Sequence, residues 1–516
     1  MTIKTPTDEQ LDCISMNVPN LVVKAFAGAG KTSMLTGFAQ YRPNDRMLYI
    51  VLNKSVQLEA IQRFEGTLVK PMTSHGLAFK KFGKNYQRKL VTSLKPYTII
   101  DLLKLEGELG GTATRNDALA FGGLILETLN RFLYSPDPEF IRSHAAPDFK
   151  NLSVFMNDRN VSNDDLRSIL ILKAEQIWRK MCDTSSTEVG MLHDGYLKLF
   201  QLSEPRLSEE YILLDEAQDA NPCVLQIMLA QESSKVFVGD SHQAIYSWRG
   251  SRNALTQAMQ QGGTARYLTG SFRFGENIAK IANMILRFTG ENLPVRGLGG
   301  EDQVGEIPKT EPRAIISRSN AGIFSYAVDA LHNRKKYWFL GGVAGYRLDI
   351  IQDVYLLSRK KRDEVRDPFI RSFGNFAELR EYANEVNDFE IRSRCHVVDE
   401  YGAQIPVLIR SMTNNVGAAS SMEEAQTILS TTHKSKGFEF TNVLLAEDFI
   451  ELNTLQDTAR KLTPEERKNL MSTVEEEINI LYVAATRAKK VLQLNSDLKI
   501  LDRKQIRHKG TRSSDE

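Results

Sequence analysis

Short apolar runs, separated by longer helix-like stretches, recur along the chain. The runs lie at residues 21–23, 47–52, 211–214, 236–238, 314–317, 337–340, 427–431, 443–446 and 491–494. A short run that is apolar throughout predicts a strand that is buried on both faces, which is typical of parallel sheets. Because helix-like stretches separate the runs, the pattern predicts an α/β fold with parallel sheets.

Two blocks of the chain interrupt this alternation. Residues 80–190 are rich in helix-like stretches, such as 117–131 and 164–180, and residues 346–425 separate two predicted strands. Because 516 residues allow about three or four domains, we expect two lobes, each carrying an inserted subdomain. The expected segments are 1–79 and 191–270 for the first lobe, 80–190 for its mainly helical insertion, 271–345 and 426–500 for the second lobe, 346–425 for a reduced insertion, and 501–516 for a polar tail.

A glycine-containing turn follows the first apolar run and precedes a helix-like stretch. Gly28 and Gly30 let the backbone curl so that successive N–H groups face an anion, and the helix adds its positive N-terminal end. Lys31 would reach the β- and γ-phosphates of ATP, and the Thr32 hydroxyl would ligate Mg²⁺. The residues expected to hold ATP here are Ala27, Gly28, Ala29, Gly30, Lys31, Thr32 and Ser33.

Two acids directly follow the apolar run at residues 211–214. The end of a buried parallel strand is where Mg²⁺ and water meet bound phosphates in folds of this class. Asp215 would therefore hold the Mg²⁺ shell, and Glu216 would polarise the attacking water. An ordinary solvated acid cluster would be the better interpretation of either residue without the glycine turn.

Further segments resemble the motifs of superfamily 1 helicases of the UvrD type, in that family's order. The matching segments are residues 7–10, 53–54, 73–75, 238–250, 268–273, 432–439 and 481–488. Ser271 and Phe272 stand where the family has asparagine and tyrosine. Residues 193–200 resemble a segment of the F-box DNA helicase branch, and the position of Gln10 near the start of the sequence predicts a member without the F-box.

This resemblance implies two RecA-like P-loop lobes with parallel sheets, and it assigns roles to single residues. Gln10 would read the adenine edge, Phe272 would stack on the adenine, and Glu439 would accept a ribose hydroxyl. The catalytic residues would be Lys31, Glu216, Gln243, Arg273 and Arg487, with both arginines acting on phosphates. The residues expected on nucleic acid are Asn53, Lys54, Thr73, His75, Tyr246, Trp248, Arg249, Thr432 and His433.

Two of these assignments have simpler alternatives. Trp248 would stack on a base, yet a lone tryptophan is more often a core aromatic, and Lys54 taken alone fits a solvated surface charge equally well. The histidines lack the spacing of metal ligands.

The resemblance implies an ATP-dependent DNA helicase or translocase with ATP and Mg²⁺ as cofactors. Its substrate would be single-stranded DNA or a junction of single and double strands, with travel from 3′ to 5′, in repair, recombination, replication or defence. Two alternatives stay open: a DNA-stimulated ATPase that strips proteins without unwinding, and an ATP-switched regulatory subunit of a larger complex. The motif order does not separate them.

Composition changes this picture little. The chain carries 66 basic and 64 acidic residues, a net charge of +2, which is compatible with DNA binding through a local basic groove but does not require it. No signal peptide or long apolar span is visible, so we expect an intracellular soluble protein without a membrane partner, cytoplasmic or, in a eukaryote, nuclear.

Overall fold

The computed structural model describes residues 5–51, 54–105, 115–146, 161–246, 254–385 and 388–512. Contacts divide the chain into two units, of which the first comprises Met1–Ala25 and Lys31–Leu268 and the second Phe26–Gly30 and Thr269–Glu516. Each unit contains a six-stranded sheet, and all strand pairs in both sheets are parallel. The predicted α/β fold with two parallel sheets is confirmed.

The sheet of the first unit has its most apolar strands in the middle. Its order is β3 (Val69–Thr73), β2 (Met47–Val51), β6 (Tyr211–Leu214), β7 (Ser234–Gly239), β1 (Asn20–Ala25) and β8 (Thr264–Leu268). β2 is buried along its whole length, because neighbours flank it on both edges and helices cover both faces.

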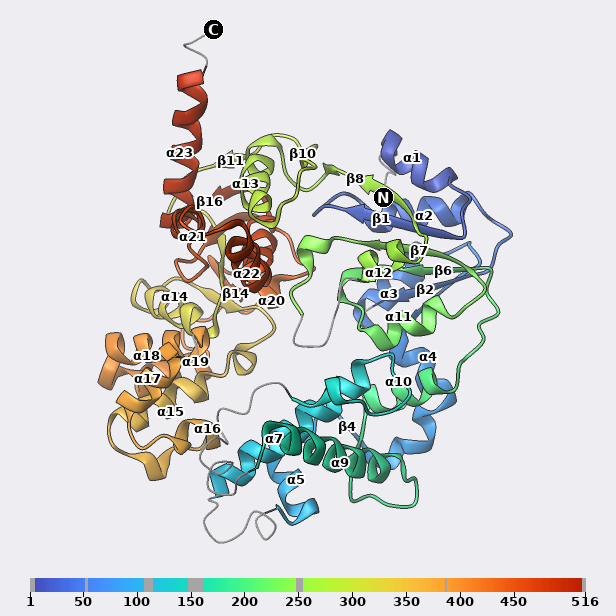
Figure 1. Ribbon diagram of the computed structural model, residues 1–516. Coiled ribbons are helices and arrows are strands. Elements are labelled where there is room, and N and C mark those ends of the chain that lie inside the picture. The colour runs from blue at the N-terminus through green and yellow to red at the C-terminus, as the bar shows by residue number, and fades with distance from the viewer. Residues whose placement is uncertain are drawn as a thin grey trace. The chain divides into compact units, whose positions relative to one another are not determined.

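Helices lie on both faces of this sheet, and Figure 1 shows α2 and α11 on opposite sides of it. The helices outside the inserted region are α1 (Asp8–Ser15), α2 (Lys31–Gln40), α3 (Lys54–Arg63), α4 (Ser74–Lys81), α10 (His193–Leu202), α11 (Pro222–Leu229) and α12 (Ala254–Gln260), with 3-10 turns η4 (Ala217–Asp219) and η5 (Ser241–Gln243). Successive strand residues therefore face different helices, since side chains alternate along a strand.

The chain between α4 and α10 is mainly helical. It contains η1 (Gly83–Lys89), α5 (Pro96–Leu103), α7 (Arg115–Tyr134), η2 (Arg142–His144), α9 (Asn163–Cys182) and a small parallel pair, β4 (Leu90–Val91) with β5 (Met191–Leu192). Its apolar side chains join the core beneath the sheet, where Ile125, Leu129 and Ile177 share one buried cluster with Val22 and Leu48.

The second unit repeats this plan. Its sheet has the order β11 (Gln303–Val304), β16 (Ala488–Gln493), β15 (Phe440–Leu445), β12 (Arg313–Ser317), β14 (Thr427–Thr431) and β13 (Tyr337–Phe339). The other elements are β9 (Gly270–Ser271), β10 (Arg296–Gly297), α13 (Glu276–Leu286), η7 (Arg287–Thr289), α14 (Asn320–His332), α20 (Thr432–Ser435), α21 (Leu452–Ala459), α22 (Pro464–Ala485) and α23 (Ser496–Arg512).

Helices fill the chain between β13 and β14, and Figure 1 shows them gathered in one cluster. They are η8 (Val343–Tyr346), α15 (Leu348–Ser358), η9 (Arg362–Glu364), α16 (Pro368–Ser372), α17 (Phe376–Glu385), α18 (Phe389–Tyr401), η10 (Gly402–Gln404) and α19 (Ile405–Thr413). Buried residues of this cluster, among them Ile351, Leu379 and Val398, join one core with Phe324 of α14.

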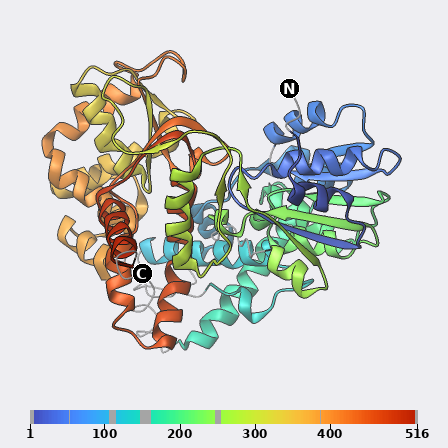
Figure 2. The ribbon, with the colours of Figure 1, turned by 90° about the horizontal axis from the view of Figure 1, so that it is seen from above.

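The end of the chain, expected to be a polar tail after residue 500, is helical as far as residue 512. A single helix, α23, runs through most of it, upright in Figure 1 and seen along its axis in Figure 2. Leu498 and Leu501 are buried and anchor its first turns, and Asn495 caps it by accepting the backbone N–H of Leu498. Two apolar side chains in a polar segment were too weak a signal to predict this helix.

The described part of the chain contains no helix that is long and apolar enough to cross a membrane.

Candidate functional site

The glycine turn lies between β1 and α2, as its sequence predicts. β1 ends at Ala25 and α2 begins at Lys31. Gly28 and Gly30 have φ values of +75° and +76°, a region that side chains other than glycine rarely adopt. The two glycines therefore give the backbone the curled form that a phosphate-binding turn requires.

Four predicted residues meet in the first unit at the end of this turn. The Lys31 Nζ atom lies 2.6 Å from Glu216 Oε2, and the Thr32 hydroxyl donates to Asp215 Oδ2 over 3.3 Å. The acids stand at the end of β6, in the middle of the sheet. Burial would lower the pKa of Lys31, but the charges of Glu216, Asp215 and Asp240 outweigh that effect and raise it. Lys31 is therefore held as a cation.

Asp215 is buried and accepts hydrogen bonds from three sides. The Tyr49 hydroxyl donates to Oδ2 over 2.5 Å, and the Glu216 backbone N–H donates to Oδ1 over 2.9 Å. Burial raises the pKa of Asp215, and the neighbouring charge of Glu216 adds to the rise, while Lys31 opposes it. A nearby cation would thus stabilise the charged form of this carboxyl group.

Glu216 has a left-handed backbone with φ of +51°, which is uncommon for a residue other than glycine. Its Oε2 atom accepts from both Lys31 and Gln218 Nε2, each over 2.6 Å. Strained backbone of this kind clusters where surrounding contacts hold a functional side chain in place. The side chain of Glu216 is therefore oriented by two donors.

A chain of hydrogen bonds continues from Glu216 to Gln243. Gln218 Oε1 accepts the backbone N–H of Asp240 over 3.0 Å, and Gln243 Nε2 donates to Asp240 Oδ2 over 2.7 Å. Gln218, Asp240 and Gln243 are all buried. A Cβ atom on Gly239 would stand 2.3 Å from Gln218 Oε1, so the close approach requires glycine. The predicted water-polarising acid and the predicted catalytic Gln243 are thus joined through three hydrogen bonds.

In the second unit, Arg273 and Glu439 pair with each other. Arg273 Nε donates to Glu439 Oε1 over 2.8 Å, and Arg273 Nη1 donates to the Thr486 carbonyl over 2.8 Å. Burial would raise the pKa of Glu439, but the charge and hydrogen bond of Arg273 outweigh this and lower it. Glu439 is therefore ionised in this pair.

Arg487 is the largest fully buried side chain in the described part of the chain. Its Nε donates to the Val483 carbonyl over 2.9 Å, within the last turn of α22. A cation near a helix C-terminus is favourable, because the helix dipole is negative there. Arg487 is thus held by the backbone of the helix that precedes it.

Residues Phe26–Gly30 have contacts in the second unit, to which they are assigned. The Ala27 N–H donates to the Tyr482 hydroxyl over 3.1 Å, and the Phe272 N–H donates to the Gly28 carbonyl over 2.9 Å. Tyr482 belongs to α22, which also carries Val483 and ends just before Arg487. The predicted nucleotide residues Ala27, Gly28 and Phe272 are thus neighbours.

Two other predicted ATP residues have different surroundings. Gln10 is buried at the start of α1, where its Oε1 accepts the Thr7 N–H over 3.1 Å and completes a capping box. Ser33 is exposed on the first turn of α2. Gln10 therefore has a structural task besides the predicted reading of adenine.

Three predicted nucleic-acid residues of the first unit, Thr73, His75 and Lys54, lie at helix starts. Thr73 caps α4 by accepting the Gly76 N–H over 2.9 Å, and His75 Nε2 lies 2.9 Å from Asp194 Oδ1 of α10. Lys54 Nζ donates to Gln57 within α3. Asp194, which lies in the segment 193–200 but received no site role from the sequence, is thus the partner of a predicted DNA contact.

The other predicted nucleic-acid residues are less informative. Thr432 is fully buried and its hydroxyl donates to the Ser317 carbonyl over 3.5 Å, which counts against direct phosphate contact. His433 and Tyr246 are half-buried. Asn53, Trp248 and Arg249 lie outside the described residues, so their roles stay predictions.

Motif reasoning missed Tyr49 and Gln218. Tyr49 is the one polar-tipped residue in the apolar strand β2, and Gln218 lies inside the acidic segment after β6. Both could have been found by asking which side chain next to a predicted acid can donate a hydrogen bond.

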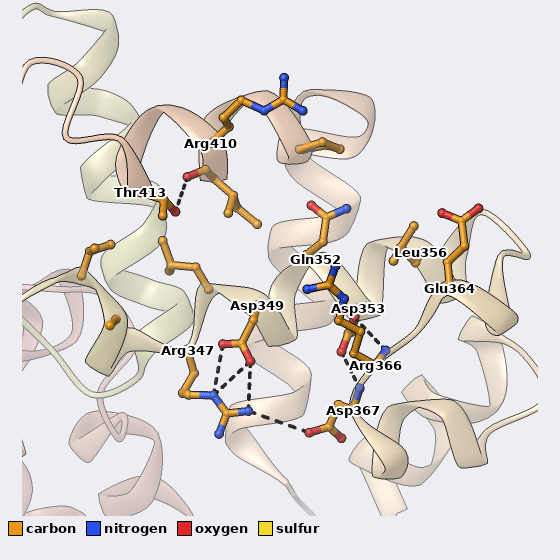
Figure 3. A pocket seen from close by; sticks show the side chains of 15 residues that line it. Arg347, Asp349, Gln352, Asp353, Leu356, Glu364, Arg366, Asp367, Arg410 and Thr413 are labelled. Carbon is orange, nitrogen blue, oxygen red and sulfur yellow. Dashed lines mark hydrogen bonds and ion pairs between the residues drawn. The ribbon is translucent and has the colours of Figure 1, made fainter.

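A large cavity of about 1060 Å³ lies elsewhere, among the helices between β13 and β14. Figure 3 shows Arg347 bound to Asp349 and Asp367, and Asp353 accepting backbone N–H groups of Arg366 and Asp367. None of the predicted site residues lines this cavity.

Comparison with known proteins gives matches along most of the chain. The model of the UvrD/REP helicase N-terminal domain matches residues 161–262, and that of the UvrD-like helicase C-terminal domain matches residues 343–497. F-box DNA helicase 1 of Gallus gallus is 32% identical over 507 residues, which cover 93% of this chain and 47% of that protein.

Two further relatives extend this result. F-box DNA helicase protein 1 of Schizosaccharomyces pombe is 30% identical over 510 residues, covering 93% of this chain and 56% of the relative. ATP-dependent DNA helicase PcrA of Leuconostoc citreum is 23% identical over 338 residues, which cover 57% of this chain and 41% of that protein. The chain spans about half the length of the F-box DNA helicases that it matches. With its two parallel sheets and these matches along most of its length, the chain belongs to the UvrD-like helicase family, near the F-box DNA helicase branch.

Proposed function

We propose that this protein is an ATP-dependent DNA helicase or translocase that moves along single-stranded DNA from 3′ to 5′. The relatives named above are DNA helicases, and one is named as ATP-dependent. The observation that carries the proposal is the meeting of Lys31, Thr32, Asp215 and Glu216 at the end of β6.

The ion pair between Lys31 and Glu216 supports a specific order of events. The β- and γ-phosphates of ATP would compete with Glu216 for the Lys31 ammonium group, since both ligands are anions. Once Lys31 binds phosphate, the hydrogen bond from Gln218 would still orient Glu216. Its carboxylate would then be available to accept a proton from the attacking water.

Mg²⁺ fits the oxygen atoms near this pair. The Thr32 hydroxyl and the Asp215 carboxylate are hard oxygen donors 3.3 Å apart, the ligand type that Mg²⁺ prefers beside substrate phosphates. When bound, the ion would neutralise charge on the phosphates. The pKa of Asp215 is raised because burial and the charge of Glu216 disfavour its ionised form. A bound cation would stabilise that ionised form, which supports a Mg²⁺ site here.

The two arginines of the second unit would complete the chemistry. We propose that Arg273 and Arg487 act on the phosphates and respond to the presence of ATP, as the motif resemblance implies. Arg273 is held by Glu439 and Arg487 by carbonyls of α22, so each has a defined resting contact that ATP would replace. We also propose that the lobe and insertion boundaries predicted from the sequence are the domain boundaries of the protein.

The DNA-contacting role rests on His75 and its partner Asp194, and on the predicted residues around Trp248. His75 and Lys54 stand at the N-terminal ends of α4 and α3. Helix starts favour phosphate groups, because their N–H groups and dipoles are positive. We propose that these residues hold the backbone of the strand.

ATP turnover with and without single-stranded DNA tests the proposal first. Continuous turnover that DNA stimulates is expected, and no stimulation by DNA would contradict it. Duplexes with a 3′ or a 5′ single-stranded extension then test polarity, because only the 3′ extension should permit strand separation. Removal of a bound protein from DNA without strand separation would favour the protein-stripping alternative.

A further inference from the structure

A second hollow of the second unit, about 600 Å³, carries an excess of positive charge. It lies between η7 and the segment that joins α21 to α22. The cations Arg287, Arg460, Arg467 and Lys468 line it, against a single acid, Glu475. The larger cavity of Figure 3 differs, because its Arg347 is paired with two of the acids in its lining.

The local hydrogen bonds leave this charge in place. Arg467 donates to the carbonyls of Ala459 over 2.9 Å and Leu462 over 3.4 Å. Carbonyl acceptors satisfy the donor groups but cancel no charge, so the guanidinium stays attractive to anions. Arg460 has Asp457 at 3.3 Å, but this carboxylate also faces Lys504 at 3.8 Å.

Glu466, which lies outside the lining, is engaged in a helix cap. Glu466 accepts the backbone N–H and the hydroxyl of Thr463, over 2.9 and 2.7 Å, in the capping box of α22. Lys468 is exposed, and within the described part of the chain it has no ion-pair partner. Among the residues that line the hollow, cations therefore outnumber acids by four to one.

The floor of the same hollow is apolar. Ala459 is buried, Phe288 and Met471 are half-buried, and Pro464 begins α22. Methionine adapts its shape to an incoming apolar group. An apolar floor beneath a charged rim is the arrangement of protein interfaces, in which a central anchor is desolvated and the rim charges steer the partner.

Nucleic acid fits these features less well. Binding of a single strand relies on several aromatic side chains in a row and on a groove that follows the backbone. Here Phe288 is the one aromatic residue of the lining, and the other floor residues are aliphatic. Lys468 also lies about 25 Å along α22 from its C-terminal end, at a rise of about 1.5 Å per residue, so the hollow is remote from Arg487.

We propose that this hollow is a docking site for an acidic segment of a partner protein that carries one large apolar anchor residue. The anchor would enter the floor beside Phe288 and Met471, and flanking aspartates or glutamates would face Arg467 and Lys468. The site does not depend on the proposed motor function, since none of its lining residues belongs to the ATP or DNA motifs.

Fluorescence anisotropy with a synthetic peptide tests this site in the full chain, without ATP or DNA. The probe carries a run of aspartates followed by a phenylalanine. One control peptide has serines for the aspartates, and a second has alanine for the phenylalanine. The parent protein should bind the probe. Each control peptide should bind at least about tenfold more weakly than the probe, because each lacks one of the two contacts.

Protein variants locate the binding. Lys468→Glu and Phe288→Ala should each weaken the affinity for the probe about tenfold. Lys280→Glu on α13, at an exposed position outside the lining, should leave that affinity unchanged. Lys468 is exposed, so its variant should fold even if Phe288→Ala does not. Absence of probe binding to the parent protein, or equal loss in Lys280→Glu, would overturn the proposal. The proposal would also be overturned if Lys468→Glu weakened the binding of a single-stranded oligonucleotide but not the binding of the peptide.

Discussion

Arg273 and Glu439 form an ion pair in which Nε and Oε1 lie 2.8 Å apart, although 166 positions separate them in the sequence. The motifs assign them to opposite ends of the nucleotide, Arg273 to a phosphate and Glu439 to the ribose. Since one guanidinium cannot serve both partners fully, the pair describes a resting arrangement that ATP binding would have to change.

Arg273→Ala should lower ATP turnover by about 10³-fold or more, the range known for arginines that stabilise charge on a transferred phosphoryl group. Single-strand affinity should change little. The kcat at saturating ATP and the Kd for a labelled oligonucleotide measure the two effects. Loss of DNA affinity with unchanged basal turnover would assign Arg273 to the strand instead.

Glu439→Gln should affect nucleotide binding rather than the chemical step. The amide keeps a hydrogen-bond acceptor but loses the charge that holds Arg273, so KM for ATP should rise while kcat stays within about tenfold. A control is Glu210→Gln, which breaks an exposed pair with Arg46. A fall in kcat as large as that of Arg273→Ala would show that Glu439 takes part in catalysis.

Lys31→Ala and Glu216→Gln should separate binding from hydrolysis. Lys31→Ala removes the cation that would neutralise phosphate, so turnover should be abolished and ATP binding weakened. Glu216→Gln should retain ATP binding and stop hydrolysis, because an amide cannot accept the proton from water. Binding of a fluorescent ATP analogue and phosphate release measure the two steps. Turnover at the parent rate in Glu216→Gln would show that another residue is the base.

The strands that the sequence predicted are the apolar ones, and this follows from their place in the sheets. β6 and β14 have the predicted bounds, and β2 ends one residue early. β3, β8 and β11 were missed, and all three stand at sheet edges. An edge strand has a neighbour on one side only, so it can be polar, as in Val69–Thr73, and lacks the continuous apolar run.

The candidate site shows a similar division. Short motifs selected Lys31, Thr32, Asp215 and Glu216, which the structure brings together, because backbone geometry ties sequence spacing to position. The partners of these residues depend on tertiary contacts that no local pattern contains: Tyr49 reaches Asp215 across 166 positions. Likewise, the burial of Thr432 and Arg487 follows from packing and could not be inferred from their motifs.

Gln218→Leu should reduce both stability and turnover. The substitution leaves the Asp240 N–H without its acceptor and removes a donor to Glu216, which should cost about 1–3 kcal/mol of unfolding free energy. Turnover should fall further than stability explains, since Glu216 loses an orienting contact. Urea unfolding and ATPase rates measure both. Gln226→Leu, at an exposed position of α11, is the control, and an equal effect there would refute the role of Gln218.

Lys198 should make stability depend on pH in the alkaline range. It is fully buried and donates to the carbonyls of Ser135 and Asp137 over 2.9 and 2.5 Å. Burial lowers the pKa of Lys198 to about 8, with Cys223 and Asp137 opposing the shift. An unfolded lysine keeps its proton to about pH 10.4. Between these values the unfolded state binds more protons, so the folded state gains stability as the pH rises.

The measurement compares the parent protein with Lys198→Met in urea at about pH 7 and about pH 10. All other titrating groups are common to both proteins, so the difference in unfolding free energy should shift in favour of the parent by at most about 3 kcal/mol. A difference that is the same at both pH values would show that Lys198 titrates normally in the folded protein.

His75 and Asp194 should act as a unit in DNA binding, since their side chains lie 2.9 Å apart. If His75 contacts the strand and Asp194 orients it, His75→Ala and Asp194→Ala should each weaken single-strand binding by several fold. The double variant should then be no weaker than the worse single variant, because both remove one contact. Asp101→Asn, at an exposed position of α5, is the control and should leave affinity unchanged. If instead the melting temperature falls while the affinity of the folded protein is retained, the pair only joins α4 to α10, and the DNA contact must be sought at Lys54.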